Sequence, residues 1–90
     1  MSVHELTKNK IVDILQKSFS PNSLEVIDDS HAHKGHKEAL LQPSAGHFRV
    51  IMTSSMFEGQ SMIQRHRMVY KALEDLMKHE IHALSLKLDN

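Results

Sequence analysis

The order of hydrophobic and polar positions predicts a helix at the start of the chain. Apolar residues recur at spacings of three and four over residues 6–19, which is typical of an amphipathic helix. Ser2 and Glu5 have the spacing of a capping box at its beginning. We expect the helix to end near Ser18, because Pro21 cannot continue it.

A second and longer helix is predicted after a turn at Gly59, over residues 62–78. Its expected apolar face contains Met62, Ile63, His66, Val69, Tyr70, Leu73, Leu76 and Met77. Arg65, Arg67 and Lys71 are expected on the other faces, toward solvent or a partner. The shorter elements need this apolar face in order to bury their own apolar residues.

Three short segments have the pattern of β-strands. Residues 24–27 are β-prone, and apolar and polar positions alternate over residues 47–53 and 81–88. In the last segment, His82 is expected on the same face as Leu84 and the later leucines. Residues 28–46 show no sustained period and predict a long loop, with a short helical turn at 37–41. We place every glycine and proline between elements.

This order of elements predicts one α+β domain over residues 1–90, with a three-stranded sheet and the helices packed on one face. The chain has no cysteine, and no apolar run approaches the length of about 20 residues that a membrane span needs. The N-terminus also lacks a signal-peptide core, so we expect a cytoplasmic protein that binds no membrane. Eleven basic and eleven acidic residues cancel, which disfavours strong nonspecific binding to nucleic acid.

Histidine is unusually frequent, with eight residues in ninety. His31, His33 and His36 lie close together in the long loop, where they form either a solvated polar segment or a metal-binding tract. When its position in the strand is considered by itself, His82 is better interpreted as a histidine at the edge of the core than as a metal ligand. His66 fits either a packed histidine or a functional one.

Several short motifs then follow one another in a recognisable order. They are Asp28-Asp29-Ser30-His31, Gly35-His36, Gly46-His47-Phe48-Arg49-Val50, Phe57-Glu58-Gly59, Arg65-His66-Arg67-Met68-Val69-Tyr70 and Ile81-His82-Ala83-Leu84. Taken together, they closely resemble the BolA family from about Leu6 to Leu88. Each motif alone is weak, and the ordered set carries the resemblance.

The resemblance implies an αββααβ fold related to the class II KH domain. It also implies a partnership with a monothiol glutaredoxin, in which the two proteins and glutathione share a [2Fe–2S] cluster. The family's ligand in the Ile-His-Ala-Leu motif corresponds to His82 here, and its loop ligand, counted three positions after Ser30, corresponds to His33. His31 and His36 are the alternates. No cofactor is expected in the isolated protein, and a weak homodimer is left open.

The same resemblance implies an alternative function, DNA-binding transcriptional regulation. The family's turn and helix at residues 57–70 have been likened to a helix-turn-helix. The residues that would bind DNA or a protein partner are Arg65, His66, Arg67 and Lys71. RNA binding of the KH kind is disfavoured, because Gly59 is not followed by the second glycine of a Gly-x-x-Gly loop.

We expect no enzymatic activity. Asp28, Ser30 and the neighbouring His31 and His33 contain the residue types of a catalytic triad, but they lie in one loop without a nucleophile elbow. The sequence contains no phosphate-binding glycine loop either. The sequence therefore predicts a binding protein.

Overall fold

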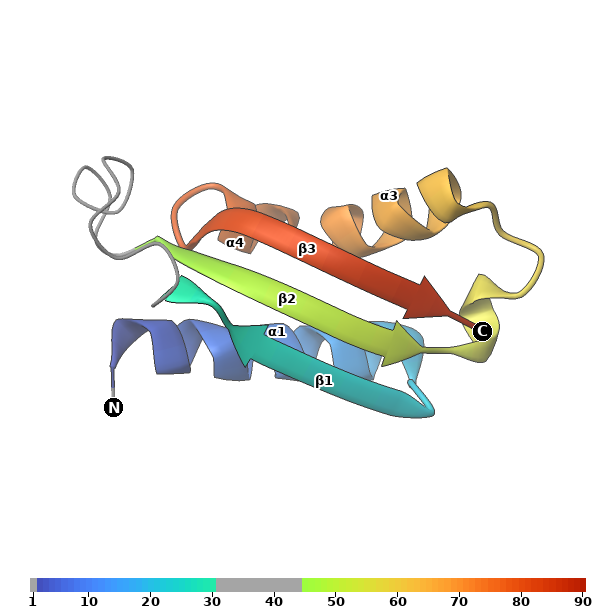
Figure 1. Cartoon of the computed structure of the whole chain (residues 1–90), viewed down its shortest axis with the longest axis horizontal. Helices are drawn as coiled ribbons and strands as arrows, with labels where there is room; N and C mark the ends of the chain where they lie inside the picture. The colour runs from blue at the N-terminus through green and yellow to red at the C-terminus, as the bar shows by residue number, and fades with distance from the viewer. Residues whose placement is uncertain (1, 31–44) are drawn as a thin grey trace.

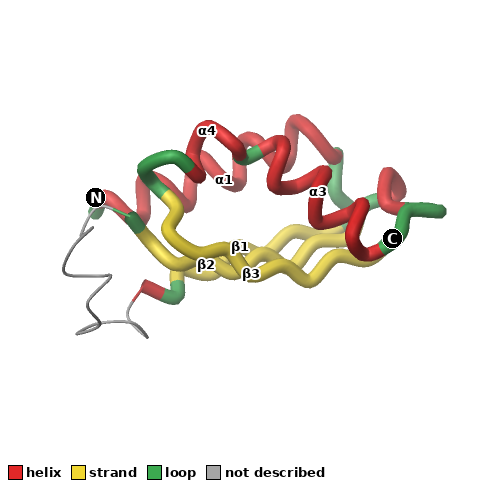
Figure 2. The backbone as a smooth tube through the Cα atoms, turned by 90° about the horizontal axis from the view of Figure 1, so that it is seen from above, coloured by secondary structure: helices red, strands yellow, loops and turns green. Residues whose placement is uncertain are grey.

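A three-stranded sheet and the helices on one of its faces make up the fold (Figures 1 and 2). The computed structural model describes residues 2–30 and 45–90. Along these residues the elements are α1 (Val3–Phe19), β1 (Ser23–Asp28), β2 (Gly46–Thr53), the 3-10 helix η2 (Ser55–Phe57), α3 (Met62–Ala72), α4 (Glu74–Met77) and β3 (Ile81–Asp89). The predicted α+β class and the αββααβ order are confirmed. The turn expected at residues 37–41 lies outside the described residues.

The sheet has the strand order β1-β2-β3. β1 and β2 pair antiparallel, whereas β2 and β3 pair parallel because η2, α3 and α4 form the connection between them. The register places Val50 opposite both Val26 and Leu86, so these side chains share one face. Figure 2 shows α1, α3 and α4 on one side of the sheet. We call the opposite side, which none of the described helices α1, α3 and α4 covers, the bare face.

A β-bulge interrupts the pairing of β2 with β3 where the two strands begin. Gly46 is opposite Ile81, but His47 is opposite Ala83, so His82 is an extra residue in β3. Ile81 is buried, whereas His82 and Ala83 are both exposed and point away from the helices. The expectation that His82 shares the face of Leu84 is therefore wrong, because the bulge shifts the alternation by one position.

Helix α1 packs its apolar side against the sheet. Its buried residues are Thr7, Ile11, Leu15 and Phe19, at a constant spacing of four. Leu6, predicted as part of this face, is 48% exposed. The Ser2 cap is confirmed, because the Glu5 N–H donates to Ser2 Oγ over 3.1 Å. Across residues 2–30 and 45–90, no helix combines the length and the apolar character needed to cross a membrane.

The predicted helix over residues 62–78 is two helices. Leu73 stands between them with φ −100° and ψ 11°, and α4 begins at the next residue. Val69 and Leu73 before the break, and Leu76 after it, are all buried in the same core. Because residues on both sides of the break still bury the same face, the spacing of apolar residues does not reveal it. The break at Leu73 was therefore not predicted.

Part of the apolar face predicted for this helix lies in solvent. Met62 is 54% exposed, Ile63 is 65% exposed and Tyr70 is 38% exposed. In α3, Val69 is the residue that is fully buried. The predicted apolar residues cover too wide a part of the helix surface for all of them to contact the sheet. Met62, Ile63 and Tyr70 therefore remain exposed to solvent. These exposed residues return below as a separate surface.

We expect Gly46→Ala to lower the free energy of unfolding by about 1–3 kcal/mol. Gly46 was predicted to lie in the preceding loop, and this prediction is wrong, because Gly46 is the first residue of β2. A Cβ there would lie 2.6 Å from Phe48 Cε2 and 2.8 Å from His4 Nδ1. The ring of Phe48 is 2% exposed and has little room to move. Urea denaturation followed by far-ultraviolet circular dichroism measures the effect.

The matched control is Ser85→Ala, on the exposed side of β3, which should change stability by less than about 0.5 kcal/mol. Equal stability of the Gly46→Ala variant and the parent would contradict this prediction. It would mean that the rings of Phe48 and His4 move aside without a loss of free energy.

Candidate functional site

Two histidine side chains lie together at the end of the sheet where β2 and β3 begin. His82 is the bulge residue of β3, and His47 is the second residue of β2. Their ring centroids are 5.0 Å apart, with an angle of 50° between the planes. His82 is exposed, whereas His47 is only 7% exposed. We call these two residues the histidine pair.

The bulge explains why the two rings meet. His47 alternates with the core residue Phe48, so its side chain lies on the bare face. The extra residue in β3 turns His82 to that same face, next to the strand that carries His47. In a regular strand His82 would have followed the alternation of Leu84 and pointed toward the helices. The irregularity therefore creates the pair.

Backbone contacts hold His47 against the end of β1. The His47 N–H donates to Ser30 Oγ over 3.2 Å, and the Asp29 N–H donates to the His47 carbonyl over 2.7 Å. The Ser30 N–H in turn donates to Asp28 Oδ1 over 2.9 Å. On the other side, the Gly46 N–H donates to the Glu80 carbonyl over 3.0 Å. The described residues on either side of positions 31–44 therefore both lie beside the histidine pair.

A shallow hollow of about 160 Å³ adjoins His47. It is lined by Asp29, His47, Phe48, Ala83, Leu84 and Ser85. A carboxylate oxygen of Asp29 is 3.2 Å from the Arg49 guanidinium, so its charge is partly balanced. The hollow is small, and of the histidine pair only His47 lines it.

The histidine pair supplies two imidazole donors and too few ligands to enclose a metal. Within residues 2–30 and 45–90, no three His, Cys, Asp or Glu side chains are arranged to hold an ion. Further ligands would have to come from a partner or from the segment that contains His31, His33 and His36, which lies outside the described residues. The described residues therefore contain an incomplete ligand set.

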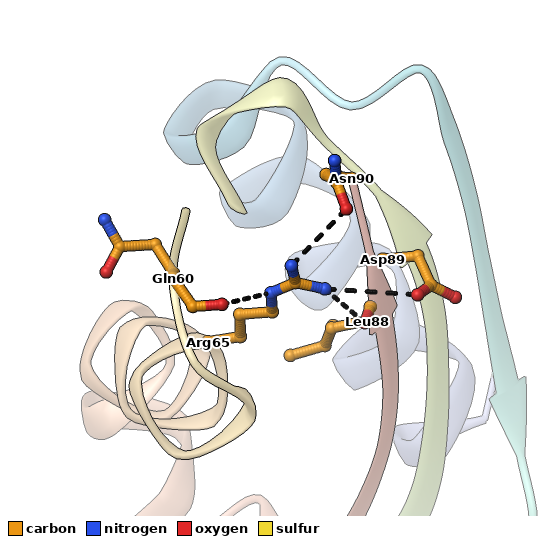
Figure 3. Close-up of polar contacts among 5 residues, drawn as sticks. All are labelled: Gln60, Arg65, Leu88, Asp89 and Asn90. Carbon is orange, nitrogen blue, oxygen red and sulfur yellow. Dashed lines mark hydrogen bonds and ion pairs between the residues drawn. The ribbon is translucent and has the colours of Figure 1, made fainter. Parts of the chain in front are cut away.

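Arg65, predicted to point toward solvent or a partner, folds back onto the chain instead (Figure 3). Its Nε donates to the Gln60 carbonyl over 2.9 Å, and its Nη1 donates to the Leu88 carbonyl over 3.2 Å. Further contacts reach Asn90 Oδ1 at 3.4 Å and Asp89 Oδ1 at 3.9 Å. The side chain is 13% exposed. The prediction of its direction is wrong, because the end of β3 supplies acceptors that the local sequence does not show.

The other predicted partner-binding residues of α3 do reach the surface. Arg67 and Lys71 are exposed, and the Lys71 ammonium is 3.6 Å from the Glu74 carboxylate. His66 is half-buried and lies beside Arg67 in an apolar cleft on α3. The structure therefore separates the predicted residues into two places, His82 at one end of the bare face and His66 with Arg67 on α3.

Comparison with known proteins supports the resemblance seen in the motifs. A family model described as BolA-like protein matches residues 15–90. The chain belongs to the BolA-like family. It is 33% identical to the DNA-binding transcriptional regulator BolA of Escherichia coli (strain K12) over 81 residues, which cover 90% of this chain and 72% of that protein.

Further similarity is found to a protein and to a solved domain structure from Arabidopsis thaliana. SufE-like protein 1, chloroplastic/mitochondrial, is 40% identical over 82 residues, which cover 86% of this chain and 22% of that protein. The chain thus spans about a fifth of that relative. The solved structure of the BolA domain of SufE1 superposes with a TM-score of 0.80 at 35% identity, covering 92% of this chain and 90% of the domain. These names state no catalysed reaction, and the absence of enzymatic activity stays a prediction.

Sequence reasoning did not predict that His47 lies beside His82. His47 lies in the motif Gly46-His47-Phe48, which we used for the resemblance and not for a ligand. The available signal was the alternation of β2, which puts His47 on the face opposite Phe48. Only the register with β3 shows that this position meets His82.

Proposed function

We propose that this BolA-like chain is a non-enzymatic adaptor that binds a monothiol glutaredoxin and shares a [2Fe–2S] cluster with it. The process served would be iron–sulfur trafficking or iron sensing. Glutathione and the glutaredoxin would supply thiolate ligands, since this chain has no cysteine. The observation that carries the proposal is the exposed His82 ring, with a second imidazole 5.0 Å away.

The donor chemistry of the histidine pair fits such a cluster. Two imidazoles on one iron, with thiolates on the other, is a known ligation pattern for [2Fe–2S] centres, and it raises their reduction potential. A set of two imidazoles in the described residues suits a site that is completed at an interface. Imidazole binds a metal in its neutral form, so the complex should weaken as the pH falls.

The second ligand from this chain is His33 in our proposal, with His31 and His36 as alternates. Ser30, the last described residue before His33 in the sequence, is anchored to the backbone of His47. The structure adds His47 as a further candidate, because its ring already lies beside that of His82. An exposed His82 and a buried His47 suggest that His82 is the first to meet the partner.

Replacing His82 with alanine should abolish cluster sharing. We mix the variant one-to-one with [2Fe–2S]-loaded monothiol glutaredoxin and glutathione. The visible circular dichroism signal of the mixed complex should disappear, because the affinity for the cluster falls by at least about tenfold. His82 is exposed at a bulge, so its removal leaves the core intact. Visible absorption and circular dichroism during a titration measure the loss.

The matched control is His79→Ala, another exposed histidine, which should leave the spectrum unchanged. His33→Ala and His47→Ala are then compared, and the variant that weakens the complex identifies the second ligand. A parent-like spectrum for His82→Ala would contradict the proposal.

A second candidate function is DNA binding, favoured by the name of the Escherichia coli relative. On this chain it would use the exposed cations Arg67 and Lys71 together with His66. The contacts of Arg65 with the end of β3 reduce the charge available for phosphate. Duplex binding that strengthens at low salt and weakens in Arg67→Gln would support this function, whereas affinity independent of salt would contradict it.

A further inference from the structure

Helix α3 carries an apolar cleft that neither the core nor the histidine pair uses. The residues lining it are Met62, Ile63, His66, Arg67 and Tyr70, and its volume is about 390 Å³. We call it the α3 cleft. Met62 and Ile63 are more than half exposed, at 54% and 65%. Adjacent apolar side chains left in water in this way are typical of an interaction site.

The α3 cleft is held in place before any partner arrives. A reciprocal capping box between Ser61 and Gln64 fixes the start of the helix. The Tyr70 hydroxyl donates to the Leu84 carbonyl over 3.0 Å, which anchors the ring that lines the cleft. Arg65 ties the same helix to the end of β3 (Figure 3). A site whose backbone and ring are already anchored loses less conformational freedom on binding.

The charge around the α3 cleft is positive. The helix over Met62–Ala72 contains no acidic residue. Among the residues that the structure describes, Arg67 has no hydrogen bond or ion pair, so its guanidinium is available to a ligand. Lys71 stands one turn further along and has its only described ion pair with the exposed Glu74. A partner should therefore present carboxylates next to apolar side chains.

The same charges disfavour two other occupants. A second copy related by two-fold symmetry would bring Arg67 and Lys71 of both chains into one interface, where like charges repel. Nucleic acid needs several phosphate contacts, whereas the walls of the cleft are mainly Met62, Ile63 and the ring of Tyr70. An amphipathic helix laid along the cleft satisfies both the apolar walls and the flanking cations.

We propose that the α3 cleft docks an acidic amphipathic helix of a protein partner, with aliphatic side chains against Ile63 and a carboxylate on Arg67. This site is distinct from the histidine pair. The helices cover one face of the sheet and the histidine pair lies on the bare face, so both can be occupied together (Figure 2). The chain would then connect a helix-bearing partner with whatever binds at His82.

Fluorescence anisotropy with designed peptides tests the proposal on the full chain. The probe is a fluorescein-labelled peptide of about 16 residues, with leucines at helical spacings of three and four and glutamates at most other positions. Its twin has lysine in place of every glutamate. We expect the glutamate peptide to bind at least about tenfold more tightly than its twin, and Ile63→Glu to weaken it by about tenfold.

Two variants make the result specific. Arg67→Glu should reverse the preference and favour the lysine twin. Leu6→Glu, on α1 and also 48% exposed, is the matched control and should bind like the parent. Equal binding of both peptides, or undiminished binding by Ile63→Glu, would overturn the proposal. So would displacement of the peptide by duplex DNA, or self-association of the chain through Ile63.

The outcome does not depend on the cluster proposal. His82→Ala should bind the glutamate peptide with parental affinity, because the histidine pair lies on the other face. Failure of the peptide with retention of the shared cluster removes the α3 proposal alone.

Discussion

Phe57→Ala should lower the free energy of unfolding by about 3–5 kcal/mol. Phe57 is 0% exposed, and its ring centroid is 5.3 Å from that of Phe19. The guanidinium carbon of Arg65 lies 6.0 Å from the centroid of the same ring. Alanine would leave a cavity where α1, η2 and α3 meet. Domains of this size are commonly stable by only about 5–15 kcal/mol, so a large part of the stability is at stake.

Urea denaturation followed by far-ultraviolet circular dichroism measures this loss. The control is Met56→Ala, one residue earlier in η2 and 48% exposed, which should cost less than about 0.5 kcal/mol. A loss below about 1 kcal/mol for Phe57→Ala would mean that the neighbouring rings collapse into the space and that the junction is not rigid.

Arg65→Gln is expected to destabilise the fold by about 2–3 kcal/mol. The guanidinium is 13% exposed and donates to two backbone carbonyls, those of Gln60 and Leu88. A glutamine is too short to reach both, so one partly buried carbonyl would lose its partner. The same denaturation experiment measures the change. The result shows how much the contact between the start of α3 and the end of β3 stabilises the fold.

Arg67→Gln is the control with the same change in charge. Arg67 is exposed and has no hydrogen bond or ion pair among the described residues, so this variant should keep parental stability. Equal stability of the two variants would show that Arg65 contributes nothing to the fold. Any DNA-binding experiment on Arg65 variants needs this measurement first, because a loss of binding could follow from a loosened α3.

The sequence predicted the parts of the fold that depend on local alternation. Residues 47–53 were correctly assigned to a strand, since Phe48, Val50 and Met52 face the core and their neighbours do not. The break between α3 and α4 was not predicted, because the spacing of Val69, Leu73 and Leu76 conceals it. The alternation of a strand, by contrast, is encoded within a few neighbouring residues.

The candidate site was only partly predictable, because it depends on contacts between distant segments. His82 was named from its motif, but its neighbour His47 emerges only from the register of β2 with β3 and from the bulge between them. Arg65 turns inward because Leu88 offers a carbonyl, a contact 23 positions away in sequence. The loop histidines His31, His33 and His36 lie outside the described residues, and their roles stay predictions.

The contacts of Tyr70 and Arg65 with β3 have a consequence for how this protein assembles. The carbonyls of Leu84 and Leu88 point away from β2, toward the side where a further strand would pair, and these two side chains occupy them. An edge strand with free carbonyls is a template for another chain and a starting point for fibrils. Helix α3 thus occupies two outward carbonyls of this edge strand, at Leu84 and Leu88, and hinders the pairing of a further strand at these positions.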